Sequence, residues 1–331
     1  QQTDSPTPHR SAVLQTSATF PLIWVGVLVT TYDSEIALPE STYTFGYNLL
    51  AYPWQTWLFG PWDLFIEHGH RRLGVLAGLL TIALVVSVWM SDRRPWVRGL
   101  SVFTLLLVIG QGLLGGARVL MDARQLAMIH GCTGPVFFAV CVAMAVVTSR
   151  LWRQSEVVDP NAQASRLHRL AAITALLSYG QLVLGATLRH VPVMASHGVF
   201  RASVLFHIVF AVVLLIHGVL LATNILRHHR GVRGLYGPSM LLVALLGFQM
   251  MLGAATWVVK YGWPYWMAEF QFAAVYTVQA KSMSQALIVT SHVATGSLIL
   301  AMSVLLAVRS VRLVRGNVAA VGSTAVLLEF A

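Results

Sequence analysis

Long apolar segments separated by short polar stretches make up most of this chain. A helix needs about 20 residues to cross a hydrocarbon core roughly 30 Å thick. Eight segments are of about that length: residues 13–31, 70–90, 97–119, 126–149, 167–188, 202–226, 238–259 and 284–308. The pattern predicts an all-α integral membrane protein with eight transmembrane helices.

The second half of the chain repeats features of the first. Equivalent residues recur at similar spacing: His70 and His207 lie 137 positions apart, Gln111 and Gln249 lie 138 apart, and His130 and His292 lie 162 apart. The last spacing is larger because a long loop precedes the eighth segment. Four segments per repeat preserve orientation, so the repeats should be parallel and related by an axis along the membrane normal. We expect two four-helix bundles, residues 1–150 and 151–331, each with a similar site.

Lys and Arg are divided unevenly between the two sides of the predicted bundle. Fourteen of the 22 fall at the N-terminus, in the even-numbered connections or after the last segment, and eight fall on the other side. Cytoplasmic flanks are rich in these residues, so both termini should be cytoplasmic. The 32–66 loop carries acidic residues but no Lys or Arg before residue 67 and belongs outside. No transit-peptide pattern is evident, which favours a multi-pass protein of the bacterial plasma membrane.

Composition excludes a soluble protein and a nucleic-acid-binding protein. Only 10% of the residues are charged, against about 25% in soluble domains. The net charge of +10 comes from arginines that flank apolar segments, so we expect no nucleic-acid partner. Cys132 and Cys141 lie on one helix more than about 13 Å apart, and we expect packing residues rather than a disulfide.

Four histidines lie in apolar segments: His70, His130, His207 and His292. An imidazole in a membrane span is costly unless it has a partner, so such residues are candidates for a functional site. In the predicted orientation all four fall in the outer half of the bilayer. The pairs His70/His130 and His207/His292 are therefore candidate iron ligands at two haem-sized sites. The alternative is four histidines hydrogen-bonded to neighbouring helices. The histidines in the basic flanks, His9, His168, His228 and His229, are expected to be solvated.

Gln111, Gln181 and Gln249 each precede a glycine by four positions, in the third, fifth and seventh segments. Small residues in a span suit close helix packing or the approach of a flat ligand. A glutamine there can hydrogen-bond a neighbouring helix or a haem propionate. The sequence leaves both alternatives open.

A carboxylate stands beside the first histidine. Glu67 precedes His70 by three positions, so both lie on one helix face, and Arg71 follows. A carboxylate next to a haem iron can move a proton or stabilise a developing cation. Exposure at the outer interface is the other interpretation of Glu67.

Glu67, His70 and Arg71 match the Glu-x-x-His-Arg motif of the haem A synthase family, which this chain resembles over roughly residues 13–310. The resemblance also covers the eight spans, the repeat and the histidine near the outer start of each even-numbered span. It implies that His207 and His292 are axial ligands of a resident haem b. It further implies that His70 and His130 hold the substrate, with Glu67 catalytic. Arg71, Gln111 and Gln249 are further residues expected to contact the cofactor.

The family oxidises one methyl group of haem O to a formyl group by two hydroxylations and loss of water, which gives haem A for cytochrome oxidase. Haem O and the bilayer are thus expected partners, with haem O synthase, oxidase subunits or a second copy of the chain as further candidates. Two alternatives remain open. One is a membrane cytochrome b that exchanges electrons with quinone, and the other is a non-catalytic protein that delivers haem.

The chain departs from the family in several places. Many members carry a cysteine pair in an outer loop, whereas no loop here has a cysteine, so a role for that pair does not carry over. His68 stands where an aromatic residue is usual. The aromatic-rich loop 260–283 is expected to lie in the membrane interface, cover the haem b or contact a partner. The loop with Tyr43, Trp54, Trp57 and Trp62 is expected to roof the substrate site.

Overall fold

The computed structural model describes residues 5–32, 43–44, 47–121, 123–154, 159–160, 163–192, 194–264, 266–267, 269, 277–280 and 282–315. Within these residues, eight helices are long and apolar enough to cross a membrane. They are α1 (Thr7–Thr31), α3 (Trp62–Ser91), α4 (Pro95–Leu120), α5 (Arg124–Thr148), α7 (Ala164–Arg189), α8 (His197–His228), α9 (Tyr236–Tyr261) and α11 (Met283–Leu313). The predicted all-helical membrane protein with eight spans is confirmed.

The helices are longer than the apolar segments that predicted them. Helix α3 begins at Trp62, eight residues before the expected start, so His70 lies about two turns inside the helix rather than at its end. The reason is physical: apolar composition marks only the part of a helix that crosses hydrocarbon, while the backbone stays helical into the polar interface.

Local sequence signals set several helix ends. Ser196 and Ser282 cap α8 and α11, because each hydroxyl accepts a hydrogen bond from the backbone N–H three residues later. Pro95 opens α4, where its missing N–H costs nothing. Gly262 ends α9 with φ of 87°, a backbone conformation that favours glycine.

Short elements join the long helices. They are the antiparallel strands β1 (Tyr43–Thr44) and β2 (Tyr47–Asn48), the helices α2 (Trp54–Leu58) and α6 (Arg150–Gln154), and the parallel strands β3 (Asp159–Pro160) and β4 (Val314–Arg315). The β3–β4 pair ties the connection before α7 to the end of α11.

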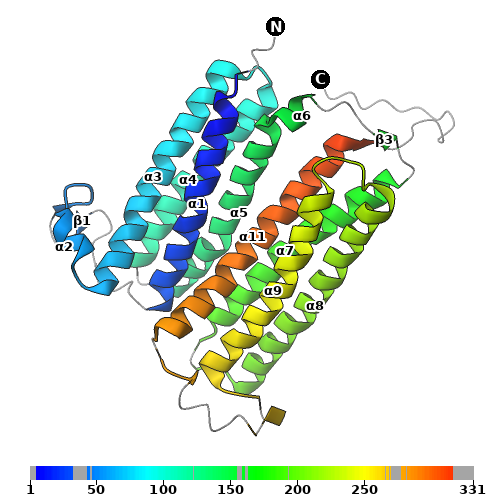
Figure 1. Ribbon diagram of the computed structural model, residues 1–331. Helices are drawn as coiled ribbons and strands as arrows, with labels where there is room; N and C mark the ends of the chain where they lie inside the picture. The colour runs from blue at the N-terminus through cyan, green and yellow to red at the C-terminus, as the bar shows by residue number, and fades with distance from the viewer. Residues whose placement is uncertain are drawn as a thin grey trace.

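The long helices contact one another in two sets. Helices α1, α3, α4 and α5 form one set, and α7, α8, α9 and α11 form the other. Helix α11 packs against α5 and α1, and α5 also touches α7, so these four helices join the sets (Figure 1). Each set has its own buried cluster, centred on Leu84 and Met144 in the first and on Leu221 and Leu242 in the second. The division into repeated domains 1–150 and 151–331 stays a prediction.

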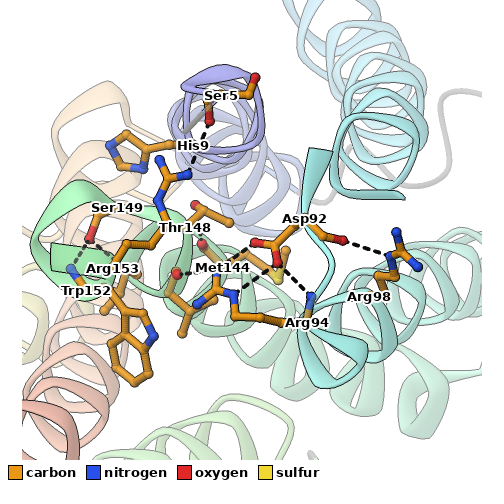
Figure 2. Close-up of polar contacts among 12 residues, drawn as sticks. Ser5, His9, Asp92, Arg94, Arg98, Met144, Thr148, Ser149, Trp152 and Arg153 are labelled. Atoms are coloured by element: carbon orange, nitrogen blue, oxygen red, sulfur yellow. Dashed lines mark hydrogen bonds and ion pairs between the residues drawn. The ribbon is translucent and has the colours of Figure 1, made fainter. Parts of the chain in front are cut away.

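A polar network closes the end of the first set where α1 begins (Figure 2). Arg94 donates from Nη2 to Oδ2 of Asp92 at 2.6 Å and to the carbonyl of Val147 on α5 at 2.9 Å. Arg98 donates to the backbone carbonyl of Asp92 at 2.8 Å. Burial by itself would raise the pKa of the Asp92 carboxyl, but the hydrogen bonds from Arg94 and the charges of Arg94 and Arg153 leave that pKa below its ordinary value.

Three histidines of the basic flanks are not merely solvated, contrary to expectation. His9 Nδ1 lies 3.0 Å from the carbonyl of Ala145, and His168 Nε2 lies 3.1 Å from the carbonyls of Ser310 and Val314. His229 is buried. The side chains of His9 and His168 tie helix ends together, a role that a charge pattern along the chain does not reveal.

Candidate functional site

One cavity of about 1930 Å³ reaches into both sets of helices, and its wall is mainly apolar. It is about twice the upper end of the ~300–1,000 Å³ range typical of small-molecule pockets. All four histidines predicted as iron ligands line it: His70 on α3, His130 on α5, His207 on α8 and His292 on α11. The cavity therefore has room for more than one large ligand.

The second pair of histidines, His207 on α8 and His292 on α11, brings two imidazole rings close together. The ring centres of His207 and His292 lie 6.4 Å apart, with the ring planes at 72°. Two imidazoles on opposite sides of one metal, each bonded at about 2 Å, have ring centres about 6 Å apart. The pair thus fits bis-histidine ligation of a haem iron without rearrangement of the helices.

The first pair lies in the other part of the cavity. His130 is within electrostatic reach of His70, and each ring approaches the backbone of a neighbouring helix, at Leu22 for His70 and at Gln111 for His130. Neither Nδ1 atom makes a well-formed hydrogen bond within the described residues, although both atoms are buried. Buried polar atoms are normally satisfied, so these rings are suited to a ligand.

Each of the four rings rests against a glycine of an adjacent helix. A Cβ built on the glycine would meet the Cε1 atom of the ring at the following distances: Gly26 to His70, 2.6 Å; Gly115 to His130, 3.3 Å; Gly185 to His207, 3.2 Å; Gly253 to His292, 3.2 Å. The contact at Gly26 is too close for any Cβ, and the other three are tighter than ordinary Cβ contacts, so the glycines make room for the imidazoles. Three of them follow a glutamine by four positions, but Gly26 follows Leu22. The glutamine pattern therefore missed it, whereas alignment of α1 with α7 identifies it.

The three glutamines hold the helices that carry the histidines. Gln181 Nε2 donates to the carbonyl of His207 at 3.0 Å, and Gln249 Nε2 donates to the carbonyl of His292 at 2.9 Å. Gln111 donates to the hydroxyl of Thr133, one turn after His130. The structure thus shows the first alternative, in which each glutamine hydrogen-bonds a neighbouring helix. The contacts of Gln111 and Gln249 with a haem stay predictions.

Glu67 is buried rather than exposed at the interface. Only 4% of it is accessible, and Arg71 Nη2 donates to its Oε1 atom at 2.6 Å. Both side chains line the cavity beside His70. A buried carboxylate is costly without such a partner, and the pair places a carboxylate and a guanidinium one turn from a candidate iron ligand.

His68 belongs to a different environment. It is fully buried outside the cavity lining, accepts a hydrogen bond from Arg72 Nε at 2.8 Å, and contacts the rings of Tyr52 and Trp57. The predicted aromatic roof over the first site therefore differs from the structure, since Trp57 packs on this outer side of α3. Among the described residues of 43–61, Leu49 lines the cavity.

Part of the aromatic-rich loop does border the cavity. Trp263 and Trp266 line it. Tyr265 and Tyr276 lie outside the described residues. The observed position agrees with a covering role, one of the three that the sequence left open.

Basic side chains gather at one end of the cavity. Arg118, which the sequence did not single out, lines it with Arg189, His190 and Lys260. Arg189 also crosses between the helix sets, because its Nη2 atom donates to Thr31 Oγ1 on α1 at 3.0 Å. These groups suit the carboxylates of a porphyrin.

The fold and the site define a multi-helix membrane protein with paired histidines in an internal apolar cavity. Residues 61–200 match a family model described as "COX15-CtaA: Cytochrome oxidase assembly protein". The chain is also 33% identical over 142 residues to "Heme A synthase" of Symbiobacterium thermophilum. Together these matches confirm the resemblance to the haem A synthase family.

Both matches cover less than half of the chain. The alignment with the Symbiobacterium protein covers 39% of this chain and 44% of that relative, less than half of its length. No solved structure is significantly similar to the chain. The family model spans Glu67, His70, Arg71 and His130, so the first site is the part of the chain that carries the family likeness.

Proposed function

We propose that this protein is a haem A synthase, a membrane oxidoreductase that converts haem O to haem A for cytochrome oxidase. One observation carries the proposal above all. Glu67 is a buried carboxylate paired with Arg71, one turn from His70 and on the wall of the cavity. A site that only transfers electrons through a bis-histidine haem has no need of that group.

In this proposal haem O is the substrate of the first site, held by His70 and His130. One methyl group becomes a formyl group through two hydroxylations and loss of water. With water as the oxygen source, this releases four electrons and four protons, and the electrons would pass through the second site to an external one-electron acceptor. Glu67 accepts a proton at the methyl carbon or stabilises the positive charge that develops. Arg71 keeps the carboxylate ionised and oriented, while Arg118 offers a cation to a propionate.

The second site is the proposed place of a resident haem b. The spacing of His207 and His292, and the buried Nδ1 atom of His292 without a well-formed hydrogen bond, fit that group. A bound haem b supplies one-electron transfer. By the offset of 137, Val204 and Ile208 stand where the first half has Glu67 and Arg71, so this site has the ligands without the acid–base pair.

The wider arrangement is part of the same proposal. Two parallel four-helix repeats, 1–150 and 151–331, each supply one histidine pair to the shared cavity. The protein lies in the bacterial plasma membrane with both termini in the cytoplasm, and both sites face the outer half of the bilayer. Haem O synthase and oxidase subunits are the proposed neighbours that provide haem O and receive haem A.

The test is pigment extraction from bacterial cells that make haem O but lack an enzyme to oxidise it. Cells that express this chain should contain haem A, separated from haem O and haem b by chromatography. A folded, haem-loaded protein without haem A in the extract would overturn the proposal. If its haem b were then reducible by quinol, the protein would be a cytochrome b. Transfer of unmodified haem to an acceptor would mark a delivery protein.

A further inference from the structure

The two parts of the cavity differ in the size of the side chains that line them. The offset of 138 between Gln111 and Gln249 aligns α4 with α9. It pairs Gly112 with Met250 and Gly116 with Ala254, and all four line the cavity. At both positions the first half has the smaller residue.

The other walls repeat this difference. The offset of 162 between His130 and His292 pairs Ala127 with Val289 and Gly131 with Val293. The offset of 137 between α3 and α8 pairs Gly74 with Ala211. These residues also line the cavity. At these five positions from three helices, the side of the cavity with His70 and His130 has the smaller residue. The first half has the larger residue at four other aligned wall positions: Glu67, Arg71, Arg118 and Phe137 against Val204, Ile208, Thr256 and Ile299. The first site is therefore the wider one only where glycine or alanine forms its wall.

The space beside these residues is not filled by protein. A Cβ added to Gly74, Gly112 or Gly131 would meet no atom within 4 Å, apart from its own helix. Glycine weakens a helix relative to alanine, and these three make no close helix contact that would require it. His70 and His130, the predicted ligands, line the same cavity. Open volume beside predicted ligands indicates room for a bulky ligand.

We propose that these small residues make the first site wide enough for a porphyrin with a long, branched apolar substituent. Haem O carries such an isoprenoid tail, whereas haem b does not. Met250, Val289 and Val293 fit the second site to the haem without the tail. The inference rests on the proposed function and deepens it, because it names side chains that select haem O for the first site and exclude it from the second.

The test exchanges wall residues between the two sites. Gly112→Met and Gly131→Val introduce the bulk of the second half into the first. The full chain, purified with haem b in the second site, is titrated with haem O and binding is followed by absorbance. Overpacking of a formed cavity should weaken haem O binding about 10-fold or more and leave the haem b content unchanged.

Gly110→Met is the matched control for Gly112→Met. Gly110 lies two positions away on α4, also faces open space, and does not line the cavity. Equal haem O affinity in the wild type, Gly112→Met and Gly110→Met would overturn the inference. So would a wild-type protein that takes up no haem O.

A gain-of-binding variant keeps the test independent of folding losses. Met250→Gly combined with Val293→Gly should admit haem O to the second site, seen as additional haem O per chain after extraction and chromatography. Unchanged haem O content would count against the inference. A wild-type protein that binds haem O selectively but never forms haem A would refute the proposed enzyme activity and leave the size selection standing, so the two failures are distinguishable.

Discussion

At the residue scale, Glu67 is unusual because its carboxylate is buried inside a membrane helix. A carboxylate inside a membrane helix is expensive, and its burial against Arg71 recovers only part of that cost. Replacement of both residues by apolar ones, as at Val204 and Ile208 in the second half, would be the simpler way to fill the space. Retention of the ion pair beside His70 is therefore best explained by chemistry at the site.

We predict that Glu67→Gln abolishes product formation without loss of resident haem. The amide keeps the size of the side chain but cannot accept a proton, so haem A yield should fall by about 100-fold or more. Haem b absorbance should stay at the wild-type level. Asp63→Asn, an exposed position one turn earlier on α3, is the control and should have wild-type yield. Equal haem A yield in both variants would rule out the assigned role.

At the scale of elements, glycines set how closely the helices approach the histidines. Gly253 on α9 lies where a Cβ would come within 3.2 Å of His292, whereas a Cβ on Gly247 of the same helix would meet nothing within 4 Å. Two glycines of one helix thus have different functions. The first admits an imidazole and the second faces open space.

Gly253→Val should displace the His292 ring and reduce haem b bound per chain, because the added methyl groups occupy the position of the imidazole. Gly247→Val is the matched control and should retain haem b. The ratio of haem absorbance to protein absorbance after purification measures both. Full haem b content in Gly253→Val would show that the contact does not position the ligand.

The turn between α3 and α4 is stabilised by the ionised form of Asp92. Because the native pKa of this carboxyl is lowered, its contribution is present above the ordinary pKa of Asp and is lost as the pH falls through the lower native value. Asp92→Asn should reduce the free energy of unfolding by about 1–3 kcal/mol at neutral pH.

Thermal unfolding in detergent across a pH series checks this expectation. The difference between the wild type and Asp92→Asn should shrink once the pH falls below about 4, where Asp92 of the unfolded chain begins to take up a proton, and should vanish below the lower native pKa. Asp63→Asn, at an exposed position of α3, is measured alongside for comparison. A constant difference across the series would mean that the ionised carboxylate is not responsible.

At the scale of the whole molecule, one cavity connects two sets of helices. Arg189 of α7, in the second set, donates a hydrogen bond to Thr31 Oγ1 on α1, in the first set. The α1 and α5 helices of the first set lie against α11 of the second (Figure 1). Helices of both sets thus hold the two histidine pairs around one cavity, as the proposed electron transfer between the two sites requires.

The orientation of this frame is also testable. The start of α1 and the ends of α5 and α11 lie at one end of the molecule, tied by His9 to Ala145 and by Arg312 to the carbonyl of Trp152. This end carries most of the basic residues and should be cytoplasmic. Alkaline phosphatase fused after residue 315 should be inactive, and the same enzyme inserted near residue 194 should be active. The opposite pattern would reverse the proposed topology.

The sequence by itself determined the features that depend on local geometry. Eight apolar lengths define eight spans, because every backbone group in lipid must be paired within its own helix. Glu67, His70 and Arg71 share a face because of the helical repeat, and the histidine pairs follow from the duplicated spacing. Only the tertiary structure decided which helix each side chain meets. The four glycines against the rings, the inward glutamines, the burial of His68 and the single shared cavity depend on how helices rotate and pack, which residue order along one helix does not specify.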